Sequence, residues 1–434
     1  MKRMLANMGL MAGLVVALAI WVQLPLTGVL ALVLLLAVWL TATRVGRQAA
    51  SVTRVGLGTT GRRLGSSLVI VLGIAGVVGV LTALLAMGAG LQDTLAGGGS
   101  DDAALILRGG APAEAQSVLG QDEIQAVNQA PGVAHDDDGR PLVSGEVIVA
   151  VNVTSRGGDD ASVQLRGVDD TAWAVRPGIE MIEGRPFRTG MQELVVGRRA
   201  SDRYAGLKPG DSVQLGPERW DVVGVFESGD GHDSELWADR NTVASAFRRG
   251  NSVSALLVGL IGADAFDGFK AALESNPQLN VRVQTTAEYF SAQSEGLVTV
   301  IRVVGIAVAA IMAIGAIFGA LNCMFAAVAA RAREIATLRA MGFRGLPVVV
   351  SIMLETMVLA LAGGLLGALL AWALFNGHSA STLAGMSQVV FSFKVDFGLM
   401  WTGIKWALAI GLVGGLFPAV RAARLPVTVA LRET

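Results

Sequence analysis

Few residues of this chain have the types and spacing that metal chemistry requires. Its 434 residues include three histidines and one cysteine. His232, Asp233 and Glu235 could act as ligands by type, but no spacing in the chain repeats a known metal-binding pattern. We therefore predict no metal site. The single Cys323 excludes a disulfide within the chain, and we interpret it as a small buried side chain in an apolar helix.

The polar segment 227–239, which contains these three side chains, is interpreted as a surface loop. Leu236 and Trp237 are apolar residues within it. Exposed apolar side chains that are rimmed by polar residues can mark a protein-binding surface. We therefore treat this pair as a candidate partner loop.

Sequence signatures of nucleotide binding and hydrolytic catalysis are also missing. A P-loop places a glycine before its lysine, so that backbone amides and the ammonium group hold phosphates. None of the five lysines follows a glycine; they are Lys2, Lys208, Lys270, Lys394 and Lys405. The signatures G-x-S-x-G and H-E-x-x-H do not occur either. We predict no catalytic residues, no cofactor held by this chain and no nucleic-acid partner.

The strongest local signal is the segment 331–343, which has the sequence RAREIATLRAMGF. Ile335, Leu338 and Met341 lie three residues apart and would form one apolar stripe of a helix with charges on its flanks. Gly342 is well placed to end that helix. A short exposed helix of this kind fits a groove on a partner protein, and a helix lying on the membrane surface is the alternative.

The elements that position this segment follow from hydrophobicity. Apolar residues make up 53% of the chain and charged residues only 16%. A helix needs about 20 apolar residues to cross the hydrocarbon layer of a membrane. Four segments reach that length, at 64–91, 297–329, 346–375 and 397–420.

Charge segregation gives the topology. Residues 92–295 contain 31 of the 35 acidic residues and 17 of the 34 basic ones, a balance of -14, so the rest of the chain carries +13. Basic residues flanking spans stay in the cytoplasm, whereas long acidic segments are exported. We therefore place 92–295 outside and the basic loop 331–345 inside a bacterial inner membrane, with both chain ends inside.

The first 43 residues are interpreted as a transmembrane hairpin of two short helices, about 5–22 and 26–42. Basic residues flank the hairpin on both sides, which requires an even number of crossings. A signal peptide and one long kinked helix are the alternatives. The full prediction is a hairpin at 1–43, a basic linker or interfacial helix at 44–63, spans at 64–91, 296–330, 346–375 and 397–420, an outer domain at 92–295, a coupling helix at 331–345, an outer loop at 376–396 and a cytoplasmic tail at 421–434.

Three kinds of residue within the spans stand out. Arg302 and Lys405 lie near the outer span ends, and we expect their side chains to reach the interface. Glu355 lies in the cytoplasmic third of its span and is interpreted as an interfacial or protonated carboxyl group. Clustered glycines suit close helix packing; these are Gly363, Gly364, Gly367, Gly411, Gly414 and Gly415.

The outer domain is predicted to be mixed α/β, with two subdomains. Alternating apolar residues predict strands at 104–108, 146–153, 163–168, 193–196, 220–226, 255–259 and 281–284. Helical patterns lie at 113–129, 241–247 and 263–273. A domain of about 200 residues is large enough to form its own core.

The segment 331–343 resembles the R-x-R-E-I-x-x-x-R-A-x-G signature of FtsX/MacB-type (type VII) ABC transporter permeases. Three further features agree in order: Glu355 early in the next span, the run Gly363-Gly364-x-x-Gly367, and PAVRAARLP at 418–426. In the order of its spans and domain the resemblance covers residues 52–434, and specific motifs lie only in about the last hundred residues.

The resemblance implies a membrane α-helical fold of four core spans, here with the N-terminal hairpin added, and a periplasmic α/β domain closer in size to that of MacB. The permease would act as a dimer of two permease subunits. A separate ATP-binding subunit would bind ATP and Mg and contact Arg331, Arg333, Glu334, Ile335, Leu338, Arg339, Met341, Gly342 and Phe343.

The function that the resemblance implies is mechanotransmission. In this mode ATP hydrolysis by the separate subunit moves the outer domain, which exports or extracts a peptide, lipid or lipoprotein. The alternative is an FtsX-like transducer that activates a periplasmic cell-wall hydrolase. MacB carries a fused ATPase where this chain has the hairpin, so MacB partners such as an outer-membrane channel do not transfer directly. Whether a periplasmic adaptor takes part is left open by the sequence. The chain contains no catalytic set of residues that would favour an enzyme.

Overall fold

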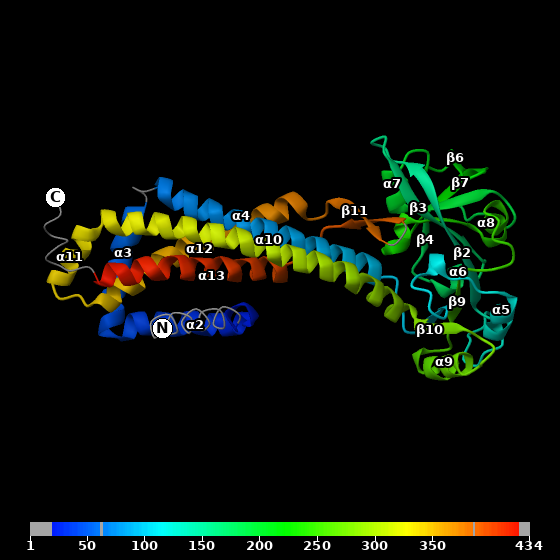
Figure 1. The fold of residues 1–434 in the computed structure, drawn as a ribbon, viewed down its shortest axis with the longest axis horizontal. Coiled ribbons are helices and arrows are strands. Elements are labelled where there is room, and N and C mark those ends of the chain that lie inside the picture. The colour runs from blue at the N-terminus through cyan, green and yellow to red at the C-terminus, as the bar shows by residue number, and fades with distance from the viewer. Residues whose placement is uncertain (1–19, 61–63, 385–386, 425–434) are drawn as a thin grey trace, which may run out of the picture. The chain divides into compact units, whose positions relative to one another are not determined.

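A computed structural model describes residues 20–60, 64–384 and 387–424 (Figure 1). The chain divides into two compact units. The helical unit comprises Met1–Met87, Ile301–Asn376 and Lys394–Thr434, and the α/β unit comprises Gly88–Val300 and Gly377–Phe393. The first arm of the predicted hairpin lies outside the described residues, except that residues 20–23 are helical.

Four helices of the described chain are long and apolar enough to cross a membrane. They are α4 (Leu64–Ala96), α10 (Thr286–Ala330), α12 (Gly345–Phe375) and α13 (Phe397–Arg424). These confirm the four predicted core spans. Helix α10 begins earlier than predicted because Thr285 and Glu288 cap its first turn: the Glu288 amide donates to Thr285 Oγ1 at 3.0 Å.

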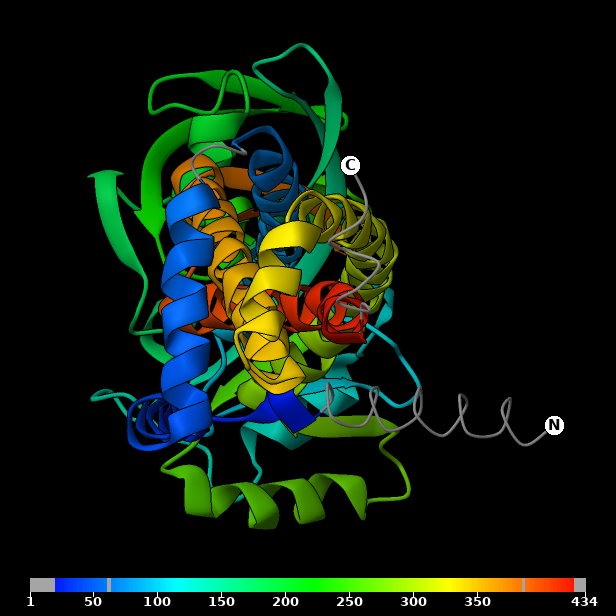
Figure 2. The ribbon, with the colours of Figure 1, turned by 90° about the vertical axis from the view of Figure 1, so that its left-hand side faces the viewer.

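Three further helices belong to the helical unit. Helix α2 (Leu26–Ala42) is apolar, and α3 (Arg44–Thr60) follows it after a bend of 99°. Figure 2 shows this bend: α3 runs from top to bottom in the plane of the view, whereas α2 is seen end-on. Helix α11 (Ala332–Ala340) lies between α10 and α12. Helices α12 and α13 pack along each other, and α3 packs against α12.

One continuous ten-stranded sheet forms the frame of the α/β unit (Figure 1). Its order is β10-β1-β9-β2-β3-β8-β5-β7-β4, with β6 paired to β7. Among the described strand pairs of this sheet, β3–β8 and β5–β7 are parallel and the others are antiparallel. Strand β2 pairs with β9 through its first residues and with β3 through the rest, so the two predicted subdomains share a single sheet.

All seven predicted strands are present, and the structure adds five more. The predicted ones are β1 (Ala103–Arg108), β2 (Val143–Thr154), β3 (Asp160–Val168), β5 (Glu193–Gly197), β7 (Glu218–Glu227), β9 (Ala255–Gly259) and β10 (Val281–Thr285). The additional ones are β4 (Glu180–Gly184), β6 (Ser212–Leu215), β8 (Leu236–Asp239), β11 (Ser379–Ala384) and β12 (Ser387–Ser392). Strands β11 and β12 pair with each other and belong to the α/β unit, so the predicted outer loop 376–396 is a hairpin.

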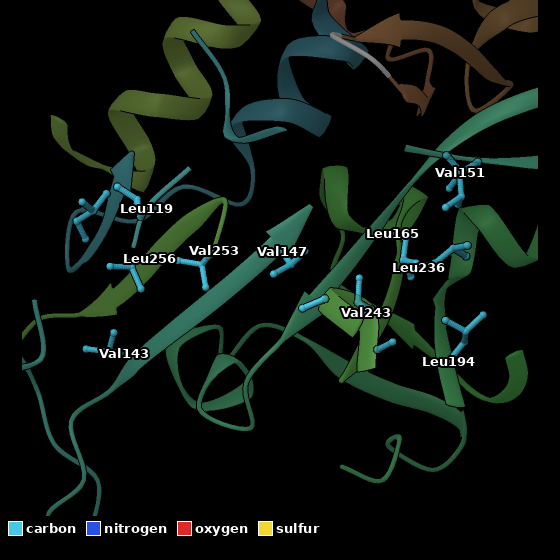
Figure 3. Close-up of a cluster of buried hydrophobic side chains, with 14 of the residues drawn as sticks. Leu119, Val143, Val147, Val151, Leu165, Leu194, Leu236, Val243, Val253 and Leu256 are labelled. Atoms are coloured by element: carbon cyan, nitrogen blue, oxygen red, sulfur yellow. The ribbon is translucent and has the colours of Figure 1, made fainter. Parts of the chain in front are cut away.

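Short helices connect these strands. The predicted helix 113–129 is divided into η2 (Glu114–Gln116) and α5 (Gln121–Asn128), and 263–273 into η4 (Ala263–Ala265) and α9 (Phe266–Glu274). Helix α8 (Arg240–Ala246) matches its prediction; α6 (Ala172–Val175), α7 (Arg198–Arg203) and η3 (Gly231–Ser234) were not predicted. Figure 3 shows the core between sheet and helices, where Val147, Leu165, Leu236 and Val243 are almost completely buried. Burying such side chains stabilises the unit by about 1.5–3 kcal/mol each.

Candidate coupling site

The segment 331–343 forms the helix that its periodicity predicts. Helix α11 begins after Arg331, and Gly342 ends it by adopting φ of 97°, a conformation that favours glycine. The amides of Gly342 and Phe343 donate to the carbonyls of Arg339 and Leu338, both at 3.1 Å. The local sequence alone therefore accounts for the length of this helix.

A groove with a volume of about 320 Å³ lies against α11. Five of the predicted contact residues line it, namely Arg331, Glu334, Ile335, Leu338 and Met341. The other four, Arg333, Arg339, Gly342 and Phe343, do not. The remaining walls come from α3, α10 and α12, including Val52, Val55, Met324, Val328, Ile352 and Glu355.

The apolar stripe of α11 changes from buried to exposed along its length. Ile335 is buried in the core of the helical unit, Leu338 is half-buried, and Met341 is 64% exposed. Ile335 therefore holds α11 onto the helices, whereas Leu338 and Met341 are the side chains that a partner can reach. A single docking stripe would have exposed all three.

An ion pair joins α11 to the neighbouring span. Arg331 Nη1 lies 3.0 Å from Glu355 Oε2, and each side chain is 12% exposed. Arg331 also contacts Glu334 through Nε at 3.2 Å. Glu355 is thus in direct contact with Arg331. Gly56 of α3 passes close by, because a Cβ there would lie 3.2 Å from both Arg331 Nη2 and Glu355 Oε2.

The clustered glycines lie at helix–helix contacts. A Cβ added at Gly363 or Gly367 would lie 2.8 Å or 2.4 Å from a backbone carbonyl of α4. Gly364, Gly411 and Gly415 lie at the α12–α13 contact, where an added Cβ would lie 2.4–2.7 Å from an atom of the other helix. Gly414 faces α10 in the same way at 2.9 Å.

Two features predicted at the surface are buried. Leu236 and Trp237 have no exposed area and form part of β8, so they belong to the domain core and the partner-loop prediction is wrong. Lys405 is 8% exposed and donates hydrogen bonds to the backbone carbonyls of Val22 and Leu24, so other parts of the chain cover its side chain. Packing partners distant in sequence decide both cases.

Glu235, one of the polar residues of segment 227–239, belongs to a buried charge network around Arg166. Arg166 is 1% exposed and donates all five of its N–H groups to Glu114, Glu146 and Glu235. Trp237 Nε1 donates to Glu235 at 2.8 Å, and His232 Nδ1 lies 2.9 Å from Asp230 Oδ1. No sequence pattern indicates this network, because its members come from different strands and loops.

We expect the α/β unit to lose stability as the pH falls from about 4.5 towards 2. Burial by itself would raise the pKa of Glu146, but Arg176 and Arg166 outweigh it and hold the pKa at about 2, below the ordinary 4.5. A lowered pKa stabilises the folded state above the ordinary pKa, by about 3 kcal/mol here, and that stability is lost on protonation.

Urea unfolding of the full chain, followed by pulse proteolysis within the α/β unit, measures this effect. The Glu146→Gln variant should be less stable at pH 7 and show a shallower dependence on pH below 4.5. Equal slopes for wild type and variant would contradict the assignment.

Comparisons with known proteins agree with this arrangement. The description "MacB-like periplasmic core domain" matches residues 67–295, and "FtsX-like permease C-terminal" matches residues 306–427. The Escherichia coli macrolide export ATP-binding/permease protein MacB is 24% identical over 360 residues, which cover 76% of this chain and 50% of that protein. The chain thus spans about half the length of such relatives.

Two further proteins match parts of this chain. The uncharacterized ABC transporter permease YknZ of Bacillus subtilis is 24% identical over 296 residues, covering 63% of this chain and 71% of that protein. The crystal structure of the periplasmic region of MacB from Actinobacillus actinomycetemcomitans covers 44% of this chain and 92% of that chain, at 15% identity and a TM-score of 0.35.

Proposed function

The chain belongs to the MacB/FtsX-type family of ABC transporter permeases, and on this premise we propose that it transmits the work of a separate ATP-binding subunit to its α/β domain. It is a membrane protein with an extracytoplasmic domain. We place it in the bacterial inner membrane, with α11 in the cytoplasm. ATP and Mg would be bound by the partner subunit.

The groove beside α11 is the observation that carries this proposal. It combines a mainly apolar wall with an exposed Met341, a half-buried Leu338 and the charged pair Arg331–Glu355. An apolar pocket with a few fixed polar groups suits one inserted segment of a partner protein. In this proposal that segment belongs to the ATP-binding subunit.

Transmission would use elements that are continuous or tightly joined. Force on α11 reaches α12 through the Arg331–Glu355 pair and the buried Ile335, and α12 packs closely on α13 and α4. Helices α4 and α10 each contribute residues to both units, so movement of these helices is a direct route to the α/β domain. We propose that the cargo is a peptide, lipid or lipoprotein handled outside the membrane by a permease dimer, with or without an adaptor.

Replacing Leu338 by aspartate should abolish capture of the ATP-binding subunit while the permease stays folded. A carboxylate at the half-buried edge of the groove would meet an apolar partner without a compensating charge, which costs several kcal/mol. We expect at least a tenfold loss of the ATP-binding subunit, and of ATPase activity, in permease purified from native membranes.

The matched control is Ala340→Asp, which adds the same charge to an exposed position of α11 that does not line the groove. It should retain the ATP-binding subunit. Normal copurification with Leu338→Asp would refute the coupling assignment. A cell-wall hydrolase crosslinked to the α/β domain, with no cargo lost on deletion of the permease, would favour the FtsX-like alternative.

A further inference from the structure

Lys405 is a charged residue inside an apolar helix, and the coupling site does not use it. It lies in α13, whose apolar character qualifies it as a membrane span, and its side chain is 8% exposed. A charged group within a span is costly and needs a specific partner. The identity of that partner therefore indicates what Lys405 does.

The partner of Lys405 is the N-terminal segment of the same chain. Lys405 Nζ donates to the carbonyl of Val22 at 2.5 Å and to that of Leu24 at 3.4 Å. In return, the indole Nε1 of Trp21 donates to the backbone carbonyl of Lys405 at 2.9 Å. These reciprocal hydrogen bonds join positions more than 380 residues apart in sequence.

The N-terminal segment has acceptors to offer because its helix is interrupted. Residues 20–23 are helical, α2 begins at Leu26, and Pro25 between them has no N–H group to donate. Carbonyls at a helix C-terminus lack intrahelical donors and carry partial negative charge. An ammonium group is a strong donor for such carbonyls, because a hydrogen bond from a charged donor is stronger than one between neutral groups.

Side-chain packing holds α2 only weakly. Val29 is the one buried residue among those of α2, whereas Leu30, Val33, Leu34 and Leu35 are each more than half exposed. Helix α3 is held differently: it packs against α12, with Val52 buried and Gly56 beside the Arg331–Glu355 pair. The segment 20–60 thus contacts the core at its two ends.

We propose that Lys405 is the docking residue for the N-terminal segment, so that residues 20–60 form a strap across the permease core. The strap is fastened to α13 by Lys405 and to α12 by α3. The groups that Lys405 binds are backbone carbonyls at the end of a helix that stops just before Pro25. Because Val52 and Val55 form one wall of the groove beside α11, the strap sets the shape of that groove.

Hydrogen–deuterium exchange on the full chain in lipid nanodiscs tests the strap. Lys405→Met keeps an unbranched side chain of similar length but leaves the carbonyls of Val22 and Leu24 without their donor. We expect amide exchange across residues 20–60 to rise at least fivefold, with exchange in α12 and α13 unchanged. Lys405→Arg should restore protection, and Arg302→Met, which removes a basic residue from another span, should have no effect.

A photo-crosslinker at Leu24 provides a second measurement. It should label peptides of α13 in the wild type and lose at least four-fifths of that product in Lys405→Met. If Lys405→Met leaves both exchange and crosslinking unchanged, the docking role is wrong. If Lys405→Met also lowers the protection of α13, the variant has disturbed α13 itself, and Trp21→Phe is used instead. This variant removes the hydrogen bond that the strap donates to the Lys405 carbonyl. Unchanged amide exchange across residues 20–60 in Trp21→Phe also overturns the proposal. None of these readouts depends on an ATP-binding subunit.

Discussion

Replacing Arg166 by methionine is expected to lower the unfolding free energy of the α/β unit by about 3–5 kcal/mol, because it leaves buried carboxylates without their counter-charge. Glu114, Glu146 and Glu235 surround this guanidinium at 2.5–3.1 Å. Glu146 would keep Arg176, 2.6 Å away, but Glu114 and Glu235 would lose their only ion pair in the described chain. Such a loss is a large part of the stability of a typical domain.

Pulse proteolysis of the full chain in urea, scored by cleavage within residues 92–295, measures this loss. Arg140→Met is the matched control, since Arg140 pairs with Asp136 and Asp138 at the exposed surface and should change little. Arg166→Lys should recover only part of the stability, because an ammonium group has three donors for five acceptor contacts. If Arg166→Met resisted proteolysis in urea as well as the wild type does, the network would be dispensable for the stability of the α/β unit.

Replacing Arg331 by methionine should weaken the attachment of α11 to α12 and cost about 2–4 kcal/mol, because Glu355 would remain largely buried without its ion-pair partner. The effect on function should be larger than the effect on stability. The wall of the groove includes both residues, so capture of the ATP-binding subunit should fall at least tenfold.

The charge-swapped pair Arg331→Glu with Glu355→Arg separates pairing from simple loss of charge. If the ion pair transmits force, the swapped variant should regain at least part of the ATPase activity that either single variant lacks. Arg344→Met, an exposed arginine at the start of α12, is the control for lost positive charge. Equal activity in Arg331→Met and wild type would exclude a role for the pair in coupling.

The sequence determined features that depend on local patterns. Apolar length alone predicted the four spans, because the hydrocarbon layer sets a minimum helix length. Alternation predicted seven strands, and the periodicity of 331–343 together with Gly342 predicted α11 and its end. The motifs around 331–367 also indicated the family. Each depends on residues close together in the chain.

Tertiary structure decided which side chains meet. The ion pair of Arg331 with Glu355, the wall that α3 contributes to the groove and the hydrogen bonds of Lys405 to Val22 and Leu24 join distant positions. Leu236 and Trp237 resemble a surface loop in sequence, yet the pairing of β8 with β3 and β5 buries them. Local pattern gives the type of element, whereas burial and the partner of a charge depend on the packing of the whole unit.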